Sequence, residues 1–214
     1  MLRAAQSVFA EKGYAQATVD EIAHRAEFGK GTLYNYFPGG KEDILLSIFD
    51  GLYDTICERI EAAFSAGSAS GKPFRETFRD AIRALFTFFL ERQDLFMLLV
   101  KEAQRMLLSD NPEKAAYFIR QRDRVFSHLL PPIQAAVERG EIIDLPAVAV
   151  AHTVWGNIYG IQVHLCLECT TDDASPKSIS TPDEAAEFLT AILMDGLSPR
   201  TQPRKSTNGH AQEK

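Results

Sequence analysis

The residues of this sequence that could do chemistry do not have the spacing of an active site. The five histidines fit no HExxH zinc motif, and no nucleophilic side chain has a base placed with it. We find neither paired carboxylates in an apolar context nor a glycine-rich phosphate loop that follows a strand. The sequence therefore predicts a protein that is not an enzyme and that carries neither a metal nor a cofactor.

Two cysteines could still form a reactive or metal-binding pair. In HLCLEC, residues 164–169, Cys166 and Cys169 lie three residues apart and would share one helical face, as a thiol switch or a metal site requires. However, a helix end that carries Glu168 does not lower a thiol pKa as a helix N-terminus does, and no fourth ligand is evident nearby. We interpret both cysteines as small apolar packing residues. A redox or metal-responsive regulator that uses Cys166 and Cys169 is an alternative.

Another group of polar residues has the chemistry of nucleic-acid recognition. It lies in AEFGKGTLYNYF, residues 26–37, which contains two glycines, one lysine and one carboxylate. On a helix that begins near residue 30, the outward side chains are hydrogen-bond donors suited to phosphate oxygens and base edges, and Gly31 lets the backbone come close to DNA. Two outward tyrosines would be a poor choice for a merely solvated face. The outward residues are Lys30, Thr32, Tyr34, Asn35 and Tyr36.

The neighbouring elements place this run on the second helix of a helix-turn-helix. Apolar residues predict a helix over 2–12, which a left-handed Gly13 would end. A second helix begins at Thr18, whose hydroxyl can form a capping box with Glu21. After a break of about three residues, a third short helix covers 30–37. Two short helices joined in this way, with a third packed beneath, predict a helix-turn-helix whose second helix lies in the major groove.

The rest of the chain completes the prediction of an all-α protein. Hydrophobic periodicity indicates no strand and six more helices, at about 41–66, 73–92, 94–109, 112–139, 145–169 and 183–197. Pro131 and Pro132 predict that the fourth of these kinks or divides near Leu130, and the polar tail over 199–214 predicts disorder. Because no apolar run is long enough to span a membrane and the chain has only three cysteines, we expect a soluble cytoplasmic protein.

Three segments together resemble the TetR family of bacterial transcription factors. They are AAQSVFAEKGYAQATVDEIAHRA, then GKGTLYNYF, then KEDILLSI, in a block from about residue 2 to residue 49. The resemblance implies an Ω-shaped homodimer of nine-helix subunits, with a DNA-binding domain over 1–46, an effector-binding and dimerisation domain over 47–198, and a tail over 199–214. By position, it also implies DNA contacts by the recognition-helix residues Lys30, Gly31, Thr32, Tyr34, Asn35 and Tyr36, and phosphate contacts by Thr18 and Lys41.

The N-terminal segment departs from the family pattern in ways that bear on DNA affinity. Glu27 stands in the turn where family members commonly have glycine, and Gly29 stands where Ser or Thr commonly caps helix three. The whole chain has a formal net charge of −6, and residues 1–50 hold five basic and seven acidic side chains. Since non-specific affinity comes from neutralising phosphates, we expect it to be weak.

The helices beyond residue 50 predict a dimer surface and a ligand site. Gly156 and Gly160 lie four apart in VWGNIYGIQ, and because glycine inside a helix costs about 1 kcal/mol relative to alanine, something must approach closely there. We expect a partner helix there, with a second helix beside it that supplies Phe188, Leu189, Ile192 and Leu193. The resemblance places a small-molecule effector among the large soft side chains of the bundle, and the expected ligand residues are Phe96, Met97, Tyr117, His152, Trp155 and Asn157.

Together these features predict a ligand-responsive transcriptional regulator. We expect a repressor that binds a near-palindromic double-stranded operator through helix three and that a small apolar or amphipathic effector releases. A helical ligand-binding dimer that has lost DNA binding is an alternative to which Glu27 and the acidic N-terminal segment point.

Overall fold

The computed structural model describes residues 1–168 and 179–196, and within these ranges the chain is all-α. The helices are α1 (Leu2–Gln16), α2 (Val19–Arg25), α3 (Lys30–Tyr36), α4 (Lys41–Ala69), α5 (Phe74–Glu91), α6 (Gln93–Leu107), α7 (Pro112–Glu138), α8 (Ala147–Glu168) and α9 (Pro182–Asp195). Their number and order confirm the expected fold class. Among these helices, none is long and apolar enough to cross a membrane. The predicted disordered tail over 199–214 lies outside the described residues.

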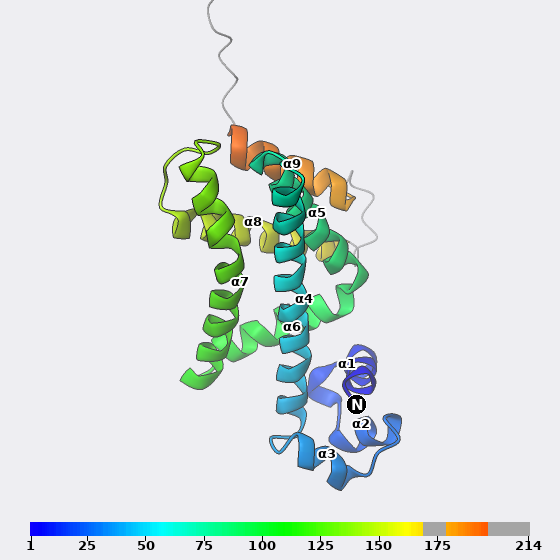
Figure 1. Ribbon diagram of the computed structural model, residues 1–214. Helices are drawn as coiled ribbons and strands as arrows, with labels where there is room; N and C mark the ends of the chain where they lie inside the picture. The colour runs from blue at the N-terminus through cyan, green and yellow to red at the C-terminus, as the bar shows by residue number, and fades with distance from the viewer. Residues whose placement is uncertain (169–178, 197–214) are drawn as a thin grey trace, which may run out of the picture.

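The long helix α4 connects two parts of the molecule. Figure 1 shows α1, α2 and α3 gathered at one end of α4, with α3 outermost, whereas α5, α8 and α9 lie toward its other end. Helix α7 runs beside α4 and packs against it. The helix predicted to read DNA is therefore presented at one end of the molecule, away from most of the bundle.

The start of the helix-turn-helix is built as the sequence predicts. The Thr18 hydroxyl accepts a hydrogen bond from the backbone N–H of Glu21 at 3.3 Å, and the Glu21 carboxylate accepts one from the Thr18 backbone N–H at 3.0 Å. This confirms the capping box. Gly13 has the expected positive φ of 77°, but the helix resumes after it and ends only at Gln16. Gly13 thus interrupts α1 rather than ending it.

Helix α7 is not divided at its two prolines, and a kink near Leu130 stays a prediction. It runs from Pro112 to Glu138 across Pro131 and Pro132. Proline at 131 removes the donor for the carbonyl of Ser127, but both residues are exposed, so water can satisfy that carbonyl. Hydrophobic packing on the opposite side of the helix can then hold it together.

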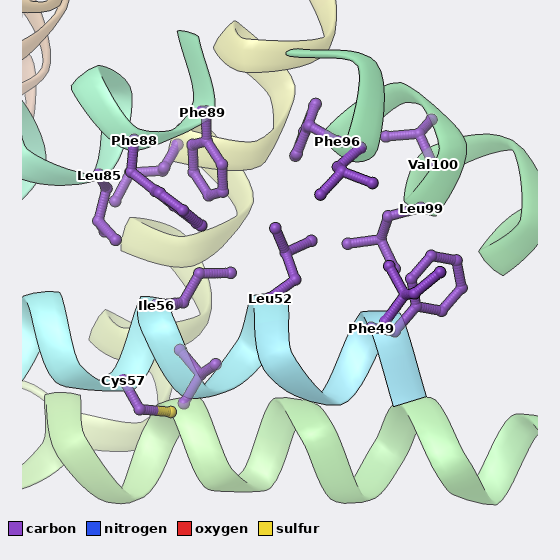
Figure 2. Packing of buried hydrophobic residues seen from close by; sticks show 14 of the residues in the cluster. Phe49, Leu52, Ile56, Cys57, Leu85, Phe88, Phe89, Phe96, Leu99 and Val100 are labelled. Atoms are coloured by element: carbon purple, nitrogen blue, oxygen red, sulfur yellow. The ribbon is translucent and has the colours of Figure 1, made fainter. Parts of the chain in front are cut away.

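The interior of the bundle is built on one face of α4. Figure 2 shows Leu52 and Ile56 of α4 pointing toward aromatic and aliphatic side chains of α5 and α6. The rings of Phe89 on α5 and Phe96 on α6 lie 4.9 Å apart between their centroids. Burial of these large side chains, about 1.5–3 kcal/mol each, fixes α5 and α6 on the helix that carries the end predicted to read DNA.

Salt bridges connect α9 to α5 along their length. Three arginines spaced four residues apart on α5 face three carboxylates on α9, which places the two helices antiparallel. Because this contact occupies one side of α9, its opposite side is the one left for other contacts. The pairs are Arg75 with Asp195, Arg79 with Glu187, and Arg83 with Asp183.

Candidate nucleic-acid interface

Helix α3 buries one residue and exposes most of its polar side chains. Leu33 is fully buried and anchors the helix on the rest of the N-terminal segment. Lys30 and Asn35 are exposed, and the exposed fraction of Tyr36 is 69%. Thr32 is half-buried. A seven-residue helix with one buried anchor presents its side chains outward, so the arrangement suits contacts with another molecule better than core packing.

Two glycines shape the surface around Tyr34. A side chain at Gly31 would meet no atom within 4 Å, so nothing within the chain requires a glycine there. Gly40 has a φ of 64°, and a Cβ there would lie 3.3 Å from the ring of Tyr34. Tyr34 thus rests against the turn before α4 while 41% of the residue remains exposed. The open surface at Gly31 is what a close backbone approach to DNA would need.

The two predicted phosphate contacts lie in different environments. Thr18 is exposed at the start of α2, and its hydroxyl accepts the capping hydrogen bond, so its proton remains available to an acceptor. Lys41 is half-buried, and its Nζ donates to the backbone carbonyls of Tyr14 at 2.8 Å and Ala15 at 3.1 Å. The carbonyls at the end of α1 attract this cation. The structure therefore turns Lys41 toward α1, and its phosphate contact stays a prediction.

Tyr14 joins the N-terminal segment to the bundle. Lys41 Nζ of α4 lies 4.6 Å from the centroid of the Tyr14 ring, and the guanidinium of Arg105 on α6 lies 5.4 Å from it. Burial, with a smaller effect from Glu42, raises the pKa of Tyr14 to about 12, so the phenol stays neutral. The contact brings α1, α4 and α6 together, so a shift of α6 would reach the end of the molecule that carries α3.

Most cations of the N-terminal segment are already paired with carboxylates. The hydrogen bond from Arg25 holds the pKa of the Glu11 carboxyl below its usual value, and the hydrogen bond to Asp20 raises the pKa of Lys30. This pairing further lowers the positive charge that the N-terminal segment can offer to DNA phosphates. The three pairs are Lys12 with Glu21, Arg25 with Glu11, and Lys30 with Asp20.

The turn between α2 and α3 holds Glu27 in a left-handed conformation. Its φ is 57°, and it is the one positive-φ residue other than glycine among the described residues. The backbone N–H of Phe28 donates to the carbonyl of Ala23 at 3.0 Å, and that of Glu27 donates to the carbonyl of His24 at 3.2 Å. This is the Schellman arrangement, which favours glycine at the position of Glu27. It gives the physical reason why glycine would suit this turn.

Replacing Glu27 with glycine is expected to stabilise the protein. A left-handed conformation costs a residue with a side chain about 1–2 kcal/mol, of which the lost rigidity of glycine offsets part, so we expect a gain of about 1 kcal/mol. Glu27→Gln removes the charge but keeps the side chain, and serves as the control. Urea denaturation would measure both variants. An equal effect of the two substitutions would show that the charge of Glu27, not its backbone conformation, sets the change in the free energy of unfolding.

Sequence reasoning missed Phe28, an apolar side chain on the same surface as α3. Phe28 directly precedes the N-cap of α3, and 46% of the residue is exposed. An aromatic residue inside a turn, outside any helical stripe, was the signal that could have found it. Its exposure beside the outward residues of α3 adds an apolar contact that could meet a thymine methyl or a sugar.

The six predicted ligand residues do not surround one space. Phe96 lies in the interior among the side chains drawn in Figure 2. The Tyr117 hydroxyl lies between α7 and α4, where it donates to the Asp50 carboxylate at 2.8 Å. Met97 lines a hollow of about 600 Å³ between α1 and α6. The sequence identified large side chains correctly but could not tell which of them pack against one another.

Two of the six residues are exposed on α8. His152 and Asn157 are exposed, whereas Val154 and Ile158 on the same helix are buried. The amide of Asn157 donates to a backbone carbonyl one turn earlier at 2.8 Å. Trp155 is half-buried between the two sides. The ring of His152 nevertheless lies 4.6 Å from that of the buried Phe126 on α7, so His152 lies at the edge of the contact between α7 and α8. Only Asn157 turns away from the bundle, which corrects its expected place inside it.

A second hollow has the composition of an apolar binding surface. It has a volume of about 400 Å³ and lies where the start of α5, the connection before α8, α8 and the end of α9 meet. Its volume is within the range of small-molecule sites. None of the six expected ligand residues lines it; the apolar side chains there include Phe74, Phe78, Ile143, Leu145, Val150 and Leu193.

A buried polar network joins α4 to α7. The Asp50 carboxylate accepts hydrogen bonds from the Tyr117 hydroxyl and, at 2.6 Å, from the Gln121 amide. Both donors are more than nine-tenths buried. Burial, followed by the hydrogen bond to Asp50, raises the pKa of Tyr117 far above its usual value. The network holds α7 in a fixed position along the helix that carries α3.

Replacing Asp50 with alanine is expected to destabilise the protein by about 2–4 kcal/mol, because two buried donors lose their acceptor. Tyr117 retains a hydrogen bond to the carbonyl of Leu46, which limits the loss. Asp54→Ala is the matched control, since it removes an exposed ion pair with Arg124 that is worth no more than about 1 kcal/mol. Urea denaturation would measure both. Equal losses would contradict the assigned role of the network.

The cysteines do not form a recognisable metal or redox centre within the described residues. Cys166 is buried, and the Gln162 amide lies 3.4 Å from its sulfur. Cys57 is also buried, and burial raises the pKa of its thiol, which disfavours the reactive thiolate. No cluster of three metal-binding side chains occurs in the part of the chain that the structure covers. Cys169 lies outside that part, so the paired site stays untested.

Comparison with known proteins identifies the family of the N-terminal segment. Residues 1–48 match the model of the family described as bacterial regulatory proteins, tetR family. The fold as a whole resembles the transcriptional regulator FadR from Bacillus subtilis, solved in complex with stearoyl-CoA, with a TM-score of 0.74 and 23% identity over 92% of this chain and 97% of that one. The N-terminal segment of the chain is that of the TetR family. The description of this family, as bacterial regulatory proteins, agrees with the prediction of a regulator rather than an enzyme.

The chain is also similar to regulators of Bacillus subtilis over part of its length. It is 32% identical to the uncharacterised HTH-type transcriptional regulator YuxN of Bacillus subtilis strain 168, over 59% of this chain and 41% of that protein. It is 44% identical to the fatty acid metabolism regulator protein of the same strain, over 28% of this chain and 31% of that protein. The matches thus span less than half the length of these relatives. The structural likeness to FadR, below 25% identity, shows the fold alone.

Proposed function

We propose that this protein is a homodimeric repressor of the TetR family that reads a near-palindromic operator with α3 of each subunit. The observation that carries the proposal is the exposure of hydrogen-bonding side chains on α3 around an open Gly31, on a helix anchored only by Leu33. Donors of this kind can reach base edges and phosphates in the major groove. The domain division at about residue 46 belongs to the same proposal.

A homodimer through α8 and α9 is supported by the outer side of α8. Side chains at Gly156 and Gly160 would meet no atom within 4 Å in the subunit, so the close approach that these glycines permit is not used within the chain. On α9, Phe188 has an exposed fraction of 46%, whereas Leu189 is buried within its own subunit. We therefore place Phe188 in the interface, and we no longer place Leu189 there.

We further propose that an amphipathic molecule with a long apolar part releases the operator. FadR, whose fold this chain shares, was solved with stearoyl-CoA, and the chain also matches a fatty acid metabolism regulator. The hollow between α1 and α6 and the apolar hollow at the start of α8 are the two described spaces where such a molecule could begin to bind. Movement of α6 would reach α1 through the contact between Arg105 and Tyr14.

The experiment has two steps. An operator is first recovered by selecting duplexes from a random-sequence library, and the purified complex is then titrated with stearoyl-CoA while DNA binding is followed by fluorescence anisotropy. We expect release by stearoyl-CoA and no release by coenzyme A alone, because the apolar chain supplies the binding energy. Retention of the complex with both ligands would contradict an acyl effector. Failure to recover any operator would contradict the whole proposal.

A further inference from the structure

Asp20 and Lys30 form an ion pair between the two helices of the helix-turn-helix. The carboxylate of Asp20, in the first turn of α2, lies 2.7 Å from Nζ of Lys30, the first residue of α3. Both side chains are well exposed, at 65% for Asp20 and 56% for Lys30. The pair therefore lies on the surface that carries the outward residues of α3, not in the packing between the helices.

Other cations nearby cannot replace Lys30 without losing partners of their own. Lys12 and Arg25 are paired with carboxylates on α2 and α1, and Lys41 donates to two backbone carbonyls. Lys30 is the cation that stands on the reading helix itself. Its partner therefore decides how much positive charge α3 presents to a duplex.

We propose that Asp20 competes with DNA phosphates for Lys30 and thereby sets the balance between non-specific and specific binding. Asp20 holds Lys30 in the free protein, and a duplex must displace it before the lysine can neutralise a phosphate. An exposed ion pair is weak enough to exchange in this way. After the exchange the carboxylate remains within a Debye length of the phosphates and repels them. The inference rests on the proposed DNA contact by α3.

The competition changes which contacts contribute most to DNA binding. Neutralising phosphates strengthens binding to every duplex alike, whereas contacts with base edges distinguish one sequence from another. By lowering the contribution from phosphate neutralisation, Asp20 leaves binding more dependent on base contacts made by residues such as Asn35. A carboxylate on this surface thus raises the ratio of specific to non-specific affinity, at the cost of absolute affinity.

The test uses duplexes of random sequence, so it does not require a known operator. Asp20→Asn removes the charge and keeps the size and the hydrogen-bonding shape of the side chain. We expect it to bind such duplexes about fivefold more tightly at 0.1 M salt and to steepen the plot of log affinity against log salt by about 0.9 for each bound subunit. Asp144→Asn makes the same charge change in the connection between α7 and α8, far from α3, and should leave both quantities unchanged.

A double-mutant cycle separates competition for Lys30 from simple repulsion. In a Lys30→Gln background, Asp20→Asn should no longer steepen the salt dependence, because no lysine remains to be released. The inference fails if Asp20→Asn behaves like Asp144→Asn, or if its full effect persists in the Lys30→Gln background. Selection of an operator by the unmodified protein, together with either result, would leave the proposed function standing. Absence of duplex binding by every variant would overturn both.

Discussion

Replacing Gly156 with leucine is expected to convert the proposed dimer to a monomer while the subunit stays folded. Within the subunit a side chain at this position meets no atom within 4 Å, and leucine favours a helix over glycine by roughly 1 kcal/mol. At a two-fold interface the added side chain is inserted twice, and overpacking costs about 1–3 kcal/mol each time. The dissociation constant of the dimer should therefore rise at least about 30-fold, as measured by sedimentation velocity.

The control for this substitution is another helical glycine in open space. Gly51 lies exposed on α4, and a side chain there also meets no atom within 4 Å. Gly51→Leu should raise helix stability in the same way and leave the oligomeric state unchanged. If Gly156→Leu and Gly51→Leu sediment alike as dimers, the interface lies elsewhere than on the outer side of α8.

The combined substitution of Thr32, Tyr34 and Tyr36 by alanine is expected to remove specific DNA binding. Each side chain offers a hydroxyl donor on α3, and hydrogen bonds to charged groups such as phosphate are worth about 1.5–3 kcal/mol. The affinity for a selected operator should fall at least about 100-fold toward the non-specific level. Anisotropy titrations measure this, and thermal unfolding checks that the half-buried Thr32 has not cost the fold.

A milder variant separates the hydroxyls from the rings. Tyr34→Phe with Tyr36→Phe keeps the contact of Tyr34 with the turn at Gly40 but removes both phenolic donors. If the hydroxyl groups make the specific contacts, this double variant should show a substantial part of the loss in operator affinity that the triple variant shows. Operator binding that survives the triple substitution unchanged would exclude α3 as the reading helix.

The sequence was sufficient to predict the elements of the reading end because their signals are local. The capping box of Thr18 and Glu21 and the positive φ at Gly13 depend on residues a few positions apart, and both are present. Leu33 is the buried residue that anchors α3. These features follow from propensity and capping, which operate within one or two turns.

What the sequence could not give depends on contacts between distant segments. Nothing near Lys41 indicates that its ammonium group reaches the carbonyls at the end of α1, about 27 residues earlier. The orientation of His152 and Asn157 depends on which side of α8 packs on α7, and hydrophobic α8 offers little contrast between its sides. The pairing of Lys30 with Asp20 likewise requires the angle between α2 and α3.

We propose that the protein recognises a specific duplex through two symmetry-related copies of α3. Selection from a random-sequence duplex library, followed by hydroxyl-radical footprinting of the enriched duplex, tests it most directly. We expect enrichment of a near-palindrome whose two protected half-sites have centres about 34–36 Å apart or a multiple of that distance. Recovery of duplexes without a shared sequence, bound no more tightly than the starting library, would contradict it.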